Sequence, residues 1–128
     1  MTEFIHDDIL DLILDGIADL CDRLFVCSTY PTTYTEASVT YMLAQHTITP
    51  GDGNGDLTVG NGDASGRKVA VTAQAAISVT NSGTALHVAL CALGTTKILA
   101  VAECTSQALT AGNTVTVPTF DIEVADPA

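Results

Sequence analysis

The sequence predicts a mainly β fold, an antiparallel β-sandwich of the immunoglobulin-like kind, preceded by one amphipathic α-helix. Two patterns lead to this prediction. Apolar residues recur at helical spacing only near the N-terminus, whereas strand-forming runs and turn residues alternate about every 8–12 residues in the second half. The composition agrees: 47% of the 128 residues are hydrophobic but only 5% are aromatic. Small side chains suit the thin core between two sheets that pack about 10 Å apart.

The helix is predicted over residues 2–24, and we assign residues 1–27 to it as an N-terminal unit. Thr2 can cap its start, and Arg23 lies near the negative end of its dipole. The apolar stripe is wider than one surface contact needs, because Leu10, Leu14 and Cys21 extend it. It either packs on the chain's own sheet or meets another subunit in part. The candidate subunit contacts are Ile5, Ile9, Leu12, Ile13, Ile17 and Leu20.

Residues 28–128 form the predicted β-sandwich. Residues 28–35 read as an ordered linker broken by Pro31, and residues 36–45 fit either a strand or a short helical turn. The later strands are separated by clear turn residues, and the runs at 84–92 and 97–105 are predicted to form a hairpin. Pro118 predicts an edge or a bulge, because proline cannot donate to a sheet. Further strands are expected at 67–73, 76–80, 114–117 and 120–124.

A Gly- and Asp-rich loop occupies residues 50–66. Its alternating polar residues are similar to the start of a calcium loop, which makes Asp52, Asn54, Asp56 and Asp63 weak calcium candidates. However, Leu57 stands where such a loop needs glycine, and no glutamate closes the motif. We therefore favour a flexible surface loop with a short strand at 57–59, and we expect no metal.

Charge and cysteine content narrow the class of partner. Four basic residues against 15 acidic ones give a formal charge of −11, which argues against a nucleic-acid partner. The four cysteines match no zinc or disulfide pattern, so we expect buried, reduced thiols. Neither a signal peptide nor an apolar run of membrane-spanning length is found, so we expect folding in the cytoplasm and no membrane partner.

No catalytic motif stands out. His6, His46 and His87 have no partner at ligand spacing in the sequence, and no nucleophile elbow, phosphate loop or zinc-protease motif is present. Most carboxylates fall on the predicted exposed face of the helix, where they form no acid–base pair. We therefore predict a protein that is not an enzyme and that needs no cofactor.

Several segments together resemble a family of small virion structural proteins of tailed bacteriophages, some of which look like head decoration (cement) proteins. The segments that carry the resemblance are CSTYPTTYTEA at 27–37, SGRKV at 65–69, SGTALHVAL at 82–90, ALTAGNTV at 108–115 and FDIEVADP at 120–127. The helix matches only in character, and the loop at 51–63 is peculiar to this sequence. These motifs are structural, not catalytic.

The resemblance implies a virion component that is assembled in the host cytoplasm. Its expected partner is a major capsid protein in an assembled lattice, and we expect a homo-oligomer, with a trimer favoured. Two alternatives remain open: a neck or tail component of the same particle, and, from another class, a sugar- or calcium-binding adhesion module.

Overall fold

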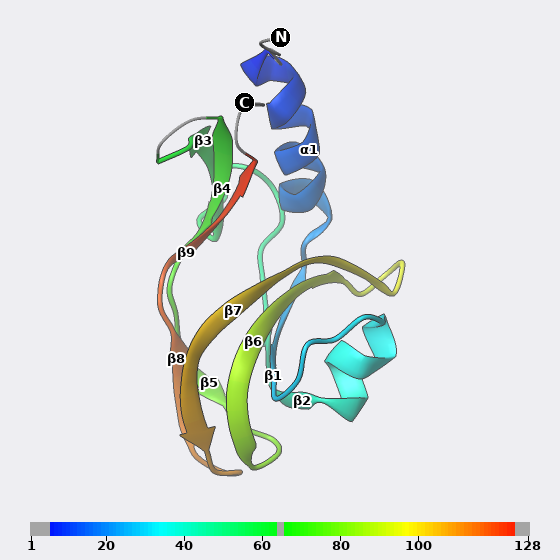
Figure 1. The fold of residues 1–128 in the computed structure, drawn as a ribbon, viewed down its shortest axis with the longest axis vertical. Coiled ribbons are helices and arrows are strands. Elements are labelled where there is room, and N and C mark those ends of the chain that lie inside the picture. Colours follow the sequence, from blue (N-terminus) through cyan, green and yellow to red (C-terminus); the bar gives the residue numbers. More distant parts are fainter. Residues whose placement is uncertain (1–5, 64–65, 125–128) are drawn as a thin grey trace, which may run out of the picture.

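The structure, a computed structural model, describes residues 6–63 and 66–124. In these ranges the fold is mainly β, with antiparallel sheets, one α-helix and one short π-helical turn (Figure 1). The elements in chain order are α1 (Asp7–Leu20), β1 (Arg23–Cys27), η1 (Glu36–Thr40), β2 (Met42–Thr47), β3 (Leu57–Asn61), β4 (Arg67–Val71), β5 (Gln74–Ser78), β6 (Gly83–Ala92), β7 (Lys97–Leu109), β8 (Thr114–Val117) and β9 (Phe120–Val124). The predicted mainly β class is therefore confirmed, and the immunoglobulin-like topology stays a prediction.

The predicted helix is too long at its C-terminal end. His6 is the N-cap, because its Nδ1 accepts a hydrogen bond from the Asp8 N–H at 3.1 Å, and the chain turns extended at Cys21. The next residues form β1, which lies between β2 and β6 in a four-stranded sheet. An apolar run that is buried on both faces fits a central strand as well as a helix, which explains the error. The predicted cap at Thr2 lies outside the described residues.

Three antiparallel sheets make up the β part of the described residues. Their strand orders are β2-β1-β6-β7, β3-β4-β9 and β5-β8. The long β6–β7 hairpin lies on one side of the β part, and the run from β8 into β9 passes alongside β7 (Figure 1). The predicted edge at Pro118 is observed, since this proline lies between β8 and β9, and each of these strands is at the edge of its sheet. The ambiguous segment at 36–45 resolves into η1 followed by the start of β2.

The main core joins the helix to all three sheets. It contains Leu14 and Ala18 of α1 together with buried residues from strands such as Leu24, Val69 and Val115. The helix therefore packs in the same core as the strands, and residues 23–27, the last part of the predicted helical segment, form β1. A second, smaller core lies on the opposite face of β1 and β6.

The second core explains why the central strands are apolar on both faces. It is built from Phe25, Cys27, Ala89 and Cys91, and Ala37 of η1 covers it. The ring of Tyr34 meets Phe25 edge-on at a centroid distance of 6.0 Å. Such an arrangement is favourable between aromatic rings, so the linker before η1 is held by packing as well as by hydrogen bonds.

Candidate interaction surface on the helix

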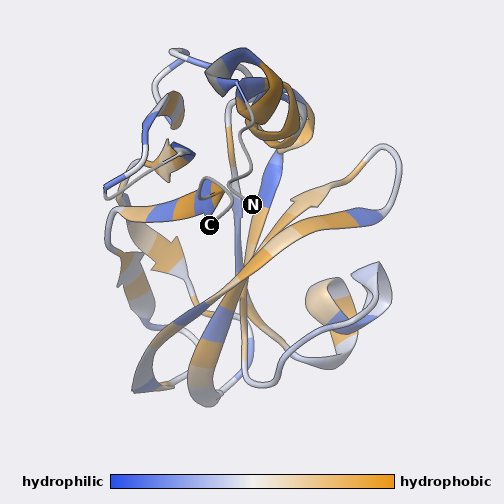
Figure 2. Cartoon of the chain, turned by 45° about the horizontal axis from the view of Figure 1, so that its top comes forward, coloured by the Kyte–Doolittle hydropathy of each residue, from blue (hydrophilic) through white to orange (hydrophobic). Residues whose placement is uncertain are grey.

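One face of α1 presents aliphatic side chains to solvent. Ile9, Ile13 and Leu20 are each 53% exposed, and Leu12 is 67% exposed. In an α-helix, residues three and four positions apart share a face, so these four lie together. Figure 2 shows hydrophobic and hydrophilic stripes side by side along α1. A contiguous exposed apolar patch on a soluble domain typically marks an interaction site.

A second face of α1 holds the helix to the protein. Leu10, Leu14, Ala18 and Cys21 are buried, and they follow one another at spacings of four, four and three residues. Ile17 is partly buried and packs against the main core. The core contact thus uses the residues that the sequence pattern treated as a widening of the stripe. Of the predicted subunit contacts, four are exposed, Ile17 is largely used internally and Ile5 lies outside the described residues.

An ion pair fixes the orientation of α1. The Arg67 guanidinium on β4 donates from Nε to a carboxylate oxygen of Asp11 at 2.6 Å, and both side chains are largely shielded from solvent. The ion pair forms only when Asp11 faces β4, so it selects one rotation of the helix about its axis. The exposed aliphatic face is therefore presented in a defined direction, away from β4.

Acidic residues border the aliphatic face. Asp8, Asp15 and Asp19 lie on the side of α1 next to Leu12, because they follow helical spacing from one another and flank it. Asp8 and Asp19 are exposed and Asp15 is half-buried. The sequence of α1 contains no lysine or arginine. The surface is thus an apolar stripe with a negative border along one edge.

Gly16 lies within the exposed aliphatic face of α1, seven residues after Ile9 and four before Leu20. A methyl group built on its Cα would meet nothing within 4 Å. Glycine lowers helix stability by roughly 0.5–1 kcal/mol relative to alanine. No close packing within the protein requires glycine at this position. The stripe therefore has a shallow dip where another backbone can approach closely.

Polar side chains of the Gly- and Asp-rich loop are engaged within the loop and with its immediate neighbours. Asp56 accepts a hydrogen bond from the Thr49 N–H at 2.7 Å, and Asp52 accepts one from the Val59 N–H at 2.8 Å. The Asn54 amide donates to the Pro50 carbonyl, and Asp63 pairs with Lys68. The four weak calcium candidates are not gathered into one ligand shell. Within the described ranges, no group of three or more histidine, cysteine, aspartate or glutamate side chains could hold a metal ion.

A row of three chemically capable residues crosses the central sheet. Cys27 of β1 is opposite His87 of β6, and His87 is opposite Glu103 of β7. Burial raises the pKa of the Cys27 thiol to about 12, and its S–H donates to the carbonyl of Ala37 at 3.5 Å. A thiol that stays protonated at neutral pH is a poor nucleophile. Cys27 thus acts here as a packing residue.

His87 is held by an aromatic contact. Tyr30 from the linker meets its ring edge-on at a centroid distance of 5.4 Å. Its Nδ1 is buried and has no hydrogen-bond partner among the described residues. The fold thus brings together Tyr30 and His87, which are far apart in the sequence, so no local pattern predicts their contact.

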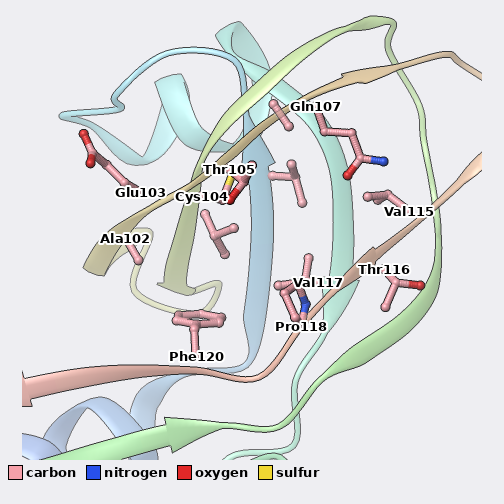
Figure 3. Close-up of a pocket in the computed structure, with 13 residues that line it drawn as sticks. Ala102, Glu103, Cys104, Thr105, Gln107, Val115, Thr116, Val117, Pro118 and Phe120 are labelled. Atoms are coloured by element: carbon pink, nitrogen blue, oxygen red, sulfur yellow. The ribbon is translucent and has the colours of Figure 1, made fainter.

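A cavity of about 310 Å³ opens between β7 and the β8–β9 run (Figure 3). Consecutive residues of both strands line it, so the strand edges themselves form its walls. Val26, Ala85 and Val88 belong to its apolar lining. Its titratable side chains are Glu103 and Cys104, and burial raises the pKa of that thiol as well. The cavity can hold apolar groups but contains no activated nucleophile.

The cavity was not predictable from the sequence, because it depends on how β8 and β9 pass β7 in space and on residues that β1 and β6 contribute to its lining. The exposed face of α1 was predictable in part: helical spacing found its residues, but spacing alone did not tell the buried side of the stripe from the exposed side. None of the helices in the described part of the chain is long and apolar enough to cross a membrane. Comparison with family models, with curated proteins and with solved structures gave no match.

Proposed function

We propose that this chain is a virion structural protein that decorates an assembled capsid lattice, and that the exposed aliphatic face of α1 takes part in that contact. The exposed face carries the proposal, because a free domain gains nothing from leaving four large aliphatic side chains in water. The resemblance of five segments to small virion proteins of tailed bacteriophages supports the same role. We further propose that the β part is a sandwich of immunoglobulin-like type.

The size of the face suits a repeated lattice. Full burial of an isoleucine or leucine side chain contributes about 1.5–3 kcal/mol, so burying four that are half-exposed contributes roughly 4 kcal/mol. Association costs about 4–15 kcal/mol in lost freedom. One such contact therefore holds a partner only weakly. A protein that touches several lattice subunits at once gains the missing affinity by avidity.

Copy number per particle tests the proposal. The assay is quantitative mass spectrometry of purified virions whose genome encodes this protein. A decoration protein should be present in hundreds of copies, because it follows the lattice. A dozen copies or fewer would instead place the protein at the neck or tail, and its absence from virions would contradict a virion role altogether.

A binding assay adds a direct test of the lattice contact. The purified chain should sediment with expanded capsids and should bind unassembled shell protein at least tenfold more weakly, because a single subunit offers a single contact. The Ile9→Ser, Ile13→Ser double variant should lose capsid binding. The matched control is Val39→Ser, which removes an aliphatic side chain that is 68% exposed on η1. Equal loss in both variants would contradict a role for α1.

A further inference from the structure

We infer that the exposed face of α1 docks a basic amphipathic surface, an apolar stripe flanked by lysine or arginine, and not a second copy of itself. The inference rests on the proposed function in taking the same face as the contact surface, and it adds the chemistry of the partner. The observation behind it is the unequal border of the stripe, which is anionic along one edge.

No lysine or arginine in the described part of the chain pairs with the negative border, and Asp8 lies 3.6 Å from Nδ1 of His6. Among the described residues, Arg67 pairs with Asp11 and Lys68 bridges Asp63 and Asp121. Asp15 and Asp19 form no ion pair within the described part of the chain. Their charges are thus free to act on a partner, and complementary charges across an interface select the partner and speed its approach.

A second copy is a poor occupant for the same reason. Antiparallel pairing of two α1 faces would bring Asp8, Asp15 and Asp19 of one copy near the same residues of the other, and like charges at close range oppose association. The apolar gain is too small to overcome both this repulsion and the loss of freedom on association. A partner with lysine or arginine beside an apolar stripe turns the same border from repulsive into attractive.

The form of the partner follows from the dip at Gly16. A helix that crosses α1 at this point can place its backbone close to the stripe, because nothing occupies the space above Gly16. Ridges of side chains on one helix pack into the grooves of another at such crossings. A basic amphipathic helix therefore fits the shape of the face as well as its charge.

Two designed peptides provide the probe. Both are helical 18-residue sequences with leucines at helical spacing, and one carries lysine where the other carries glutamate on the flanks. Binding to the full chain is measured by fluorescence anisotropy at low and at moderate salt. We expect the lysine peptide to bind at least tenfold more tightly than the glutamate peptide, and its affinity should fall several-fold as salt rises. Equal affinity of the two peptides would overturn the inference.

Variants separate this site from general attraction to an acidic protein. Asp15→Asn with Asp19→Asn should weaken binding of the lysine peptide at least fivefold, whereas Glu103→Gln, which removes an exposed charge on β7, should change it less than twofold. Ile9→Ser with Ile13→Ser should weaken it at least fivefold as well. Equal effects of the α1 charges and Glu103 would overturn the inference, because they would show that only net charge matters.

Sedimentation of the free chain distinguishes the rival occupant. A wild-type dimer or trimer that dissociates in the Ile9→Ser, Ile13→Ser variant would overturn the inference in favour of self-association through α1. The outcome is independent of the copy-number measurement. If the protein is absent from virions but still prefers the lysine peptide, the proposed function is wrong and the inference about the partner stands. If virions hold hundreds of copies but the protein does not distinguish the two peptides, the proposed function stands and the inference is wrong.

Discussion

Alanine substitutions on the two faces of α1 should have very different effects on stability. One double variant, Leu10→Ala with Leu14→Ala, truncates two leucines that are 1% and 0% exposed. The other, Ile9→Ala with Ile13→Ala, truncates two isoleucines on the same helix that are each 53% exposed. The two pairs have the same spacing and side chains of similar size, so burial is the main difference between them.

The magnitudes follow from burial. Truncating a buried leucine to alanine costs about 2–5 kcal/mol, so the buried pair should lose about 4–10 kcal/mol of a total stability of about 5–15 kcal/mol. Truncating each half-exposed isoleucine to alanine removes about 1 kcal/mol of stabilisation from apolar burial. Alanine returns a few tenths of a kcal/mol to each position, because it is the better helix former. The exposed pair should therefore cost about 1 kcal/mol in all.

Urea denaturation followed by circular dichroism measures the difference. With a slope of about 1–3 kcal/mol per molar urea, the exposed pair should shift the midpoint by about 1 M or less. The buried pair should shift it by several molar or leave no folded baseline. Equal destabilisation by the two pairs, or a larger loss from the exposed pair, would refute the assignment of the two faces.

Three further predictions concern the thiols and the loop. Burial raises the pKa of the three fully buried thiols to about 11 or 12, so at pH 8 only Cys104 should react with a thiol reagent in the folded protein, and all four should react in urea. Burial raises the pKa of Asp56, but hydrogen bonds from a backbone N–H and a side-chain amide outweigh this and lower it. Its stabilising effect should be complete above the unfolded pKa of about 3.9 and be lost as pH falls through the folded value. Asp56→Asn should thus be less stable than the wild type at pH 6, and the difference should shrink as pH falls through the folded pKa in urea titrations. Neither a chelator nor millimolar calcium should shift the melting temperature, because the loop carboxylates are engaged in its own hydrogen bonds, and a shift of several degrees would contradict this reading.

The strands were predictable where turn residues punctuate them. Residues 114–117 and 120–124 form strands with the predicted bounds, because Gly112 and Pro118 set their limits. Gly112 has a φ of +91°, a conformation that glycine adopts readily, and the turn after β7 depends on it. Local chemistry is thus sufficient to place an element when a breaker stands at each end.

The end of the helix was not predictable by the same means. No glycine or proline separates α1 from β1, and Leu24 continues the helical spacing. What ends the helix is tertiary: β1 pairs with both β2 and β6 and is buried on both faces. Likewise, helical spacing gathered the residues of the exposed face, but only the contacts of α1 with the strands decide which side of the helix faces solvent.

The central place of β1 also sets the order in which the protein can fold during synthesis. Its partner β6 pairs Leu24 with Leu90, so the middle of the four-stranded sheet closes only after about two-thirds of the chain has been made. Until then, the apolar residues of β1 have β2 on one side and an open edge on the other. Such long-range pairing slows folding, and an unpaired strand edge invites association with other chains. The acidic residues of α1, which precede β1 in the chain, oppose such association, because like charges repel.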